Sequence, residues 1–192
     1  MNTKRGRPRN LETQNAILAA SYDLLLEQGF GSVTVEKIAE RAGVSKATIY
    51  KWWPNKAAVV MDGFLSASTA KIPVPDTGSV SQDLIIHVTR LVQFMTSREG
   101  SVIKELVGEG QVNVGLAETY RSRYFQPRRI EASQIIERGI RRGELKDQLD
   151  LELCLDQIYG PIFYRLLILS DGLDESYVEN LVKLCLEGLA AR

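Results

Sequence analysis

The segment of residues 34–53, TVEKIAERAGVSKATIYKWW, constrains the fold more than any other part of the chain, because it holds two short helical patterns that a glycine separates. Thr34 stands where a helix N-cap belongs, and Gly43 ends the first pattern. Ser45 stands at the N-cap position of the second pattern, and small Ala39 lies where two helices can cross closely. The spacing predicts a helix-turn-helix, with a plain structural hairpin of helices as the alternative.

Apolar residues recur at helical spacing along most of the chain, and no segment alternates as a strand does. With 44% hydrophobic residues among 192, the chain can bury a sizeable core. We therefore predict an all-α fold of about nine helices. The expected helices cover residues 11–28, 35–42, 46–53, 56–71, 81–96, 102–109, 114–142, 151–169 and 177–189.

Glycine and proline mark the ends and weak points of these helices. Gly29 is expected to supply a left-handed stop to the first helix. Pro127 predicts a kink or break within the helix of residues 114–142. Gly160 and Pro161 are expected to interrupt the most hydrophobic helix, where they either let it bend or relieve crowding at an interface.

Charge is divided unevenly along a chain whose net charge is zero. Residues 1–60 hold nine Lys or Arg against five acids, so the remainder holds fifteen against nineteen. Such asymmetry suggests a basic module that meets a polyanion, attached to an acidic module with another task.

Composition also predicts where the domains lie. Residues 1–10 carry four positive charges and no periodicity, which is typical of a flexible basic arm, with a solubilising tail as the alternative. Residues 72–80, IPVPDTGSV, hold two prolines and a glycine and predict a linker. We assign residues 11–71 to an N-terminal three-helix domain with a fourth connecting helix, and residues 81–192 to a C-terminal helical domain.

Side chains suited to catalysis or metal binding are sparse. The single histidine, His87, lies among aliphatic residues, and the chain has no nucleophile motif or phosphate-binding glycine loop. Cys154 and Cys185 lack metal-ligand spacing and are expected to be small core residues. No catalytic residue, cofactor or metal is predicted. No stretch approaches the roughly 18 apolar residues of a membrane helix, so a cytoplasmic location is expected.

The second helix of the predicted helix-turn-helix carries hydrogen-bond donors and aromatic surface. Val44 and Ile49 are expected to lock this helix against its neighbour. A helix has the dimensions that suit the major groove of B-DNA, which favours double-stranded DNA as the polyanion. The residues that supply donors or aromatic surface are Lys46, Thr48, Tyr50 and Lys51.

Residues 29–60, GFGSVTVEKIAERAGVSKATIYKWWPNKAAVV, resemble the DNA-binding domain of the TetR family (TetR/AcrR type) of bacterial transcriptional repressors. The resemblance extends over roughly residues 11–65. Its most diagnostic part is AGVSKATIYKWWPNK, with a Gly-Val-Ser turn, an aliphatic residue and Tyr, an aromatic residue three further on, and then Pro and Lys. It implies a helix-turn-helix domain for residues 11–71 and a regulatory and dimerisation domain for residues 81–192.

The resemblance implies the DNA contacts residue by residue. Tyr50 and Lys56 are expected to hold phosphates, and residues 45–48 to face the groove, where Lys46 can read guanine. The three arginines of the arm are expected to enter an adjacent minor groove. The predicted DNA-binding set is Arg5, Arg7, Arg9, Thr34, Val35, Ser45, Lys46, Ala47, Thr48, Tyr50, Lys51, Trp52 and Lys56.

Two positions depart from the family pattern. Val35 stands where many relatives have Thr, so it offers a phosphate only its backbone N–H, although Thr34 can compensate. Trp52 precedes Trp53, and by helical phase Trp53 belongs to the core with Ile49. Trp52 either packs on a neighbouring helix or donates its indole N–H to a phosphate.

By resemblance, the C-terminal domain dimerises and binds a ligand. One recognition helix reads only a few base pairs, so a palindromic operator calls for a homodimer. The candidate interface residues, with an intramolecular core as the alternative, are Ile158, Ile162, Leu166, Leu181 and Leu184. The candidate ligand-binding residues, which are also typical of core, are Phe94, Met95, Leu106, Tyr124, Phe125, Gln157, Tyr159, Phe163 and Tyr164. Their apolar character favours a hydrophobic inducer.

The resemblance implies a ligand-responsive repressor that binds operator DNA as a dimer and releases it when an inducer binds. Release follows because a ligand that favours wider separation of the recognition helices weakens DNA binding by the same coupling free energy. The alternatives are a TetR-type activator or ligand-independent regulator, and a helical interaction protein that does not bind DNA. The protein is expected on the nucleoid when bound to its operator, and an enzyme is not expected.

Overall fold

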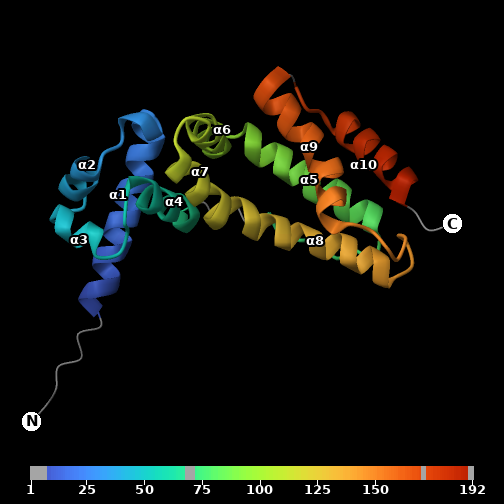
Figure 1. The fold of residues 1–192 in the computed structure, drawn as a ribbon, viewed down its shortest axis with the longest axis horizontal. Helices are drawn as coiled ribbons and strands as arrows, with labels where there is room; N and C mark the ends of the chain where they lie inside the picture. Colours follow the sequence, from blue (N-terminus) through green and yellow to red (C-terminus); the bar gives the residue numbers. More distant parts are fainter. Residues whose placement is uncertain (1–7, 68–71, 170–171, 190–192) are drawn as a thin grey trace, which may run out of the picture. The chain divides into compact units, whose positions relative to one another are not determined.

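The computed structural model describes residues 8–67, 72–169 and 172–189, and every regular element in these ranges is a helix (Figure 1). The helices form nine continuous runs, which confirms the all-α prediction. The chain divides into two compact units, one of Met1–Thr69 with Arg98–Phe125 and the other of Ala70–Ser97 with Gln126–Arg192. None of the helices in the described ranges is long and apolar enough to cross a membrane.

Helix α1 (Pro8–Ser32) opens the first unit and is interrupted at Gly29. It begins earlier than predicted because proline suits the first turn of a helix, so the prediction of a flexible arm is wrong for residues 8–10. Gly29 has φ 74° and ψ 165°, an extended conformation that favours glycine, and not the predicted left-handed helical one. A Cβ at Gly29 would lie 2.6 Å from Oε1 of Glu105, so glycine also permits the close approach of that side chain.

Three shorter helices complete the N-terminal part of this unit. They are α2 (Val35–Arg41), α3 (Lys46–Tyr50) and α4 (Lys56–Ala67), close to the predicted positions. The side chain of Asn55 caps α4, since its Oδ1 accepts a hydrogen bond from the N–H of Ala58 at 2.8 Å. Helix α1 packs along α4 and also contacts α2, and α2 contacts α3.

Helices α1 and α4 cross closely at Gly63 of α4. A Cβ at Gly63 would lie 2.1 Å from Oγ of Ser21 and 2.7 Å from the carbonyl oxygen of Leu18. Ser21 is fully buried, and its hydroxyl lies 2.8 Å from this carbonyl and 3.2 Å from the carbonyl oxygen of Val59. The crossing therefore depends on a position without a side chain.

The first unit is completed by α6 (Arg98–Gly110), α7 (Val114–Tyr120) and the π-helical segment η1 (Arg121–Phe125). Helix α6 packs on α1, and α7 and η1 pack on α4. The sequence assigned these residues to the C-terminal domain, so the compact units and the predicted domains have different borders. Segment η1 ends two residues before Pro127, which has no N–H for the preceding turn, and this irregular turn stands where a kink was predicted.

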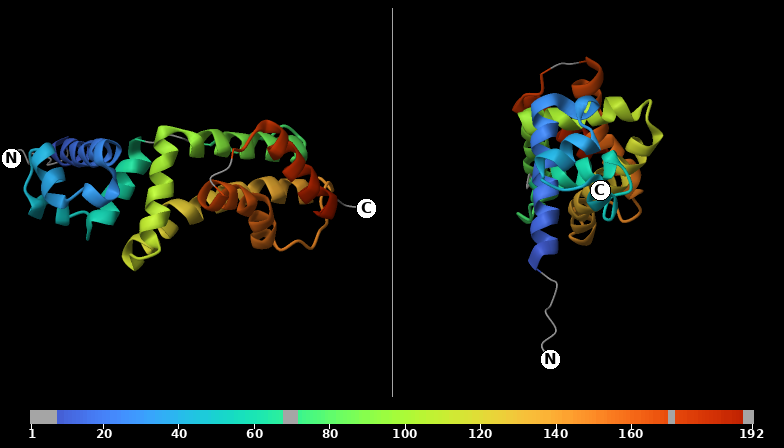
Figure 2. Two further views of the ribbon diagram at one scale, coloured as in Figure 1. Left: turned by 90° about the horizontal axis from the view of Figure 1, so that it is seen from above. Right: turned by 90° about the vertical axis from the view of Figure 1, so that its left-hand side faces the viewer.

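The second unit contains α5 (Val80–Thr96), α8 (Gln126–Arg141), α9 (Leu151–Tyr164), the π-helical segment η2 (Arg165–Leu169) and α10 (Glu175–Leu189). Helix α5 packs against α8 and α10, and α9 packs against α8 and α10 (Figure 2). Fully buried aliphatic side chains form the core between them. They include Leu84, Val88, Ile135, Ile136, Ile158 and Ile162.

Helix α9 continues through Gly160 and Pro161, so the predicted interruption is wrong. Pro161 has no N–H to donate to the carbonyl of Gln157, four residues earlier. The thiol of Cys185 on α10 donates to this carbonyl instead, with an S···O distance of 3.6 Å. Burial raises the pKa of this thiol, which keeps its proton in place. Cys154 and Cys185 are both buried, as predicted for core residues.

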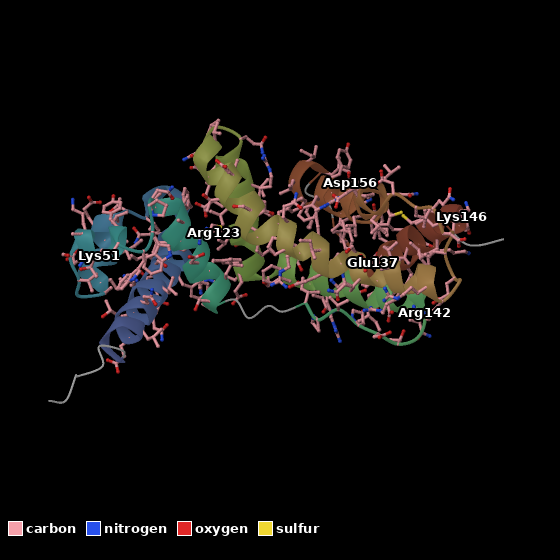
Figure 3. The ribbon with its side chains drawn as sticks, turned by 60° about the horizontal axis from the view of Figure 1, so that its bottom comes forward. Lys51, Arg123, Glu137, Arg142, Lys146 and Asp156 are labelled. Carbon is pink, nitrogen blue, oxygen red and sulfur yellow. The ribbon has the colours of Figure 1, made fainter. Side chains whose placement is uncertain are left out.

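Residues 72–79 form no helix, in agreement with the irregular linker that was predicted. Side-chain hydrogen bonds join them to α5 of the second unit. The carboxylate of Asp83, which is fully buried, accepts hydrogen bonds from the N–H and the hydroxyl of Thr77 at 2.7 and 2.8 Å. Guanidinium nitrogens of Arg138 and Arg142 lie 3.7 and 3.8 Å from its other oxygen. Figure 3 shows Arg142 near the end of α8.

Replacement of Gly63 by alanine is expected to destabilise the protein by about 1–3 kcal/mol, because the new methyl group meets the backbone carbonyl of Leu18. Gly108→Ala is the matched control, since Gly108 lies within α6, is exposed and would place its Cβ in open space. This control is expected to stabilise the protein by about 0.5–1 kcal/mol. Urea unfolding followed by circular dichroism measures both. A Gly63→Ala protein as stable as wild type would show that the crossing relaxes without cost.

Candidate DNA-binding surface

Two N-caps and a glycine turn hold the helix-turn-helix. Oγ1 of Thr34 accepts a hydrogen bond from the N–H of Lys37 at 3.2 Å, and Oγ of Ser45 accepts one from the N–H of Thr48 at 3.2 Å. Gly43 has φ 66° in the turn between the two helices. The predicted caps and turn are therefore confirmed.

The inner side of α3 is anchored by Ile49 and Trp53, whose exposed fractions are 1% and 5%. The N–H groups of Trp52 and Trp53 both lie 3.0 Å from the carbonyl oxygen of Ile49, so the turn continues directly from the helix. Nε1 of Trp53 donates to Oδ2 of Asp62 on α4 at 2.7 Å. The core position predicted for Trp53 is confirmed, and Asp62 is a partner that helical phase did not reveal.

The outer side of α3 presents Lys46, Ala47, Tyr50 and Lys51, all of which are exposed. Figure 3 labels Lys51, the C-cap residue that directly follows α3. The hydroxyl of Thr48 is partly exposed and lies 2.9 Å from the hydroxyl of Ser45, so these two groups are hydrogen-bonded to each other. The face thus combines two cations, a phenol ring and a methyl group on one rigid element.

Lys46 is paired with Glu36 of α2 across the turn. The distance from Nζ of Lys46 to Oε1 of Glu36 is 2.9 Å, and both side chains are more than half exposed. The hydrogen bond to Glu36 raises the pKa of Lys46, and the same bond lowers the pKa of Glu36. A negative charge therefore stands beside the residue that was predicted to read a base, and the sequence pattern did not identify it.

Lys56 has a structural partner inside the first unit. Its ammonium donates to the carbonyl of Phe30 at 2.9 Å and lies 4.0 Å from the centre of the Phe30 ring. Partial burial lowers the pKa of Lys56, because desolvation disfavours the charged form. Contact between Lys56 and a phosphate remains a prediction, and such a contact would share this ammonium with Phe30.

The remaining predicted DNA contacts have different settings. Val35 is buried, with 6% exposed, so its side chain belongs to the core. Trp52 is partly exposed and packs edge-to-face on Trp53, with ring centres 5.7 Å apart. Arg5 and Arg7 lie outside the described residues. Arg9 lies in the first turn of α1, and its side chain is also outside the described part.

The nine predicted ligand-binding residues fall into both compact units. Leu106, Tyr124 and Phe125 belong to the first unit, and the other six belong to the second. Met95, Leu106, Tyr124 and Tyr159 are buried, Phe94, Phe125 and Phe163 are partly exposed, and Gln157 and Tyr164 are exposed. The structure therefore does not bring the whole set together within either unit.

A polar pair in the core of the second unit was not predicted. The hydroxyl of Tyr159 lies 2.8 Å from Nδ1 of His87, and both residues are buried. Burial, with a smaller effect of Arg128 and Arg90, lowers the pKa of His87 to about 4. The imidazole is therefore neutral near pH 7, and the sequence signal for this pair was only a lone histidine among aliphatic residues.

The predicted interface residues also divide by exposure. Ile158 and Ile162 are fully buried within one chain, where the intramolecular alternative placed them. Leu166 and Leu181 are partly exposed, and Leu184 is 66% exposed. Apolar side chains that the sequence did not single out are also exposed on α9 and η2, namely Leu153, Ile168 and Leu169.

A short helix that is capped, anchored from inside and cationic outside defines this chain as a helix-turn-helix DNA-binding transcriptional regulator. Residues 17–61 match the family model described as bacterial regulatory proteins, tetR family. Residues 74–185 match the model described as tetracyclin repressor-like, C-terminal domain. The chain belongs to the TetR family, whose members are transcriptional regulators and not enzymes.

Known proteins resemble the chain over nearly its whole length. The HTH-type transcriptional regulator YdeS of Bacillus subtilis is 61% identical over 191 residues, which cover 100% of this chain and 96% of YdeS. The solved structure of the TetR-family regulator SCO0332 is 35% identical with a TM-score of 0.79, covering 92% of this chain and 98% of that one. The flavonoid-responsive regulator FrrA has a TM-score of 0.68 over 94% and 98% of the two chains, and at 21% identity it shows the fold alone.

Removal of the Glu36 charge is expected to strengthen DNA binding. Glu36→Gln keeps a hydrogen-bond acceptor for Lys46 but frees a cation that lies on the outer face of α3. We expect binding about threefold to tenfold tighter at low salt, with a salt slope about one unit steeper. Fluorescence anisotropy at several salt concentrations measures both. Glu179→Gln, the same change at an exposed site on α10, is the control, and equal behaviour of the two variants would contradict the prediction.

Proposed function

We propose that this chain is a ligand-responsive transcriptional repressor that binds a palindromic operator as a homodimer and is released by a small hydrophobic inducer. The observation that supports DNA binding best is the outer face of α3, with exposed Lys46, Tyr50 and Lys51 on a helix whose inner side is fully anchored. Such rigidity favours base reading, because specific contacts require a fixed geometry.

Within this proposal, the side chains of the surface have two kinds of role. Lys46 donates to guanine and the methyl groups of Ala47 or Thr48 contact thymine, in the major groove. Tyr50 and Lys56 contact phosphates, which fix the register of the protein on the duplex without reading sequence. Thr34, Val35 and Trp52 complete the predicted phosphate contacts, Ser45 faces the groove, and Lys51 supplies a further donor. The arginines at positions 5, 7 and 9 enter the minor groove.

A homodimer is supported by the apolar surface of the second unit. Helices α9 and α10 and segment η2 expose large apolar side chains, and a homodimer interface is a setting that buries such groups. The exposed members are Leu153, Tyr164, Ile168, Leu169 and Leu184. A dimer also presents two recognition helices to two half-sites, as a palindrome requires.

A hydrophobic inducer is supported by the aromatic and aliphatic composition of the C-terminal part, and by the name of FrrA, a flavonoid-responsive regulator with the same fold. The neutral His87 and its partner Tyr159 suit a ligand without charge, since neither side chain supplies a counter-ion near pH 7. A cytoplasmic location follows from the proposed access to chromosomal DNA.

The candidate operator is a duplex from the intergenic DNA upstream of the protein's own gene, called the upstream intergenic duplex. Tyr50→Ala is expected to weaken binding to it about tenfold or more, because an exposed ring and hydroxyl on α3 are lost without any loss of core. Fluorescence anisotropy measures the affinity, and the titration endpoint gives the stoichiometry, expected to be two protomers for each half-site pair. Lys46→Ala is compared with Lys183→Ala, a loss of the same charge on α10. Equal binding by all these variants would place the DNA contact elsewhere.

Addition of a flavonoid aglycone to the DNA complex is expected to lower operator affinity, within the roughly 5–150-fold range typical of allosteric coupling. By linkage, saturating operator DNA must lower the affinity for the same ligand by the same factor, and calorimetry with and without DNA measures this. A ligand that binds equally to free and DNA-bound protein would contradict its role as inducer.

A further inference from the structure

Asp62 on α4 joins two elements of the first unit that are far apart in the sequence. Its Oδ2 accepts the hydrogen bond from Nε1 of Trp53 at 2.7 Å. The guanidinium of Arg123 in η1 donates to both oxygens of the same carboxylate, at 2.6 Å to Oδ2. Arg123 can be located in Figure 3. The three side chains form a continuous polar chain from η1, through α4, to the turn that follows α3.

The two contacts of Asp62, with Trp53 and with Arg123, depend on each other. The indole of Trp53 is buried, and a buried N–H requires an acceptor. Asp62 supplies a charged acceptor, which makes the hydrogen bond shorter and stronger than a neutral one. Its side chain is 30% exposed, so the carboxylate is partly desolvated and gains from the adjacent guanidinium. Loss of Arg123 would leave this carboxylate to find other partners, with a change in the bond to Trp53.

The orientation of Trp53 matters because α3 is very short. Five residues make hardly more than one turn, and a helix of this length has little stability of its own. Ile49 and Trp53 are its two buried anchors. A large ring that is fixed at its N–H end therefore sets the rotation of α3 about its axis, and the outward direction of Lys46 and Tyr50 follows from that rotation.

Arg123 belongs to a different part of the sequence from the helix that it supports. It lies within the match to the C-terminal family model, residues 74–185, whereas Trp53 lies within the match to the N-terminal model, residues 17–61. Its segment η1 is π-helical, and such irregular turns are often found at functional sites. The contact gives the C-terminal part of the sequence a direct polar connection to the anchor of the recognition helix.

We propose that Arg123 and Asp62 are positioning residues for DNA recognition. They act through the indole of Trp53, which holds α3 at the rotation that operator binding needs, and they do not contact DNA. The proposal rests on the proposed DNA-binding role of α3. Because base contacts require this geometry more than phosphate contacts do, loss of Arg123 lowers operator affinity while binding to unrelated DNA stays nearly constant.

The first experiment compares Arg123→Gln with Arg121→Gln, which removes the same charge from an exposed position two residues earlier in η1. Anisotropy is measured on the upstream intergenic duplex and on a scrambled duplex of equal length. Arg123→Gln is expected to weaken operator binding roughly 5–30-fold, and Arg121→Gln less than about twofold. Arg123→Lys, which keeps the charge, is expected to restore part of the loss. Equal losses for Arg123→Gln and Arg121→Gln would overturn the proposal.

A double-mutant cycle separates positioning from a simple loss of charge. Trp53→Phe keeps a buried aromatic ring but removes the N–H that reaches Asp62. If Arg123 acts through this bond, Arg123→Gln adds less than about twofold to the effect of Trp53→Phe. If the two losses multiply, Arg123 acts by another route and the proposal fails. Asp62→Asn, which retains an acceptor for Trp53 but loses the charge, is expected to resemble Arg123→Gln and to remain folded.

The indole signals supply a readout that needs no DNA. The chain has two tryptophans, so a ¹H–¹⁵N spectrum shows two indole N–H peaks, and Trp53→Phe assigns them. Arg123→Gln is expected to shift the Trp53 peak, and Arg121→Gln to leave it in place. An unshifted peak would show that Arg123 does not control Trp53, whatever the DNA result. A shifted peak in a protein whose wild type does not prefer the intergenic duplex would refute the proposed recognition of this operator but not the connection itself.

Discussion

The candidate DNA-binding surface of this regulator depends on the contacts that hold α3 in place, because α3 has only five residues. A helix this short cannot sustain itself in water, so its position comes from outside its own hydrogen bonds. Ser45 caps its start, and Ile49 and Trp53 bury its inner side. These contacts leave Lys46 and Tyr50 on the outside. The same burial that stabilises the helix therefore decides which side chains can meet DNA.

The buried residues that anchor α3 are connected to the rest of the first unit by hydrogen bonds as well as by apolar packing. Trp53 reaches Asp62, and Asp62 reaches Arg123. A parallel contact lies at the end of α1, where the N–H of Phe30 donates to Glu105 of α6 at 2.7 Å and its carbonyl accepts from Lys56. Hydrogen bonds have narrower geometric limits than apolar contacts, so they define orientation more sharply. Residues 98–125 thereby share in the geometry of a surface that they do not form.

Local signals in the sequence predicted most of the fold. The caps predicted at Thr34 and Ser45 are correct because an N-cap bond joins residues three apart, which a sequence shows directly. Helical periodicity likewise found the core residues Ile49 and Trp53. The missing parts are contacts between distant residues. Spacing gives no sign that Glu36 pairs with Lys46 across the turn, or that Asp62 binds an arginine 61 residues away.

Pro161 shows that a local rule can also predict a feature that the structure lacks. The sequence predicted that Pro161 would interrupt α9, because proline removes a hydrogen bond that the preceding turn needs. The helix continues through this position, and the thiol of Cys185, from another helix, donates to the carbonyl that Pro161 leaves without its usual partner. The residues around Pro161 give no sign of this donor, which lies 28 residues after Gln157 along the chain. A cysteine that composition describes as a small core residue thus supplies a hydrogen bond to the helix on which the proposed dimer surface lies.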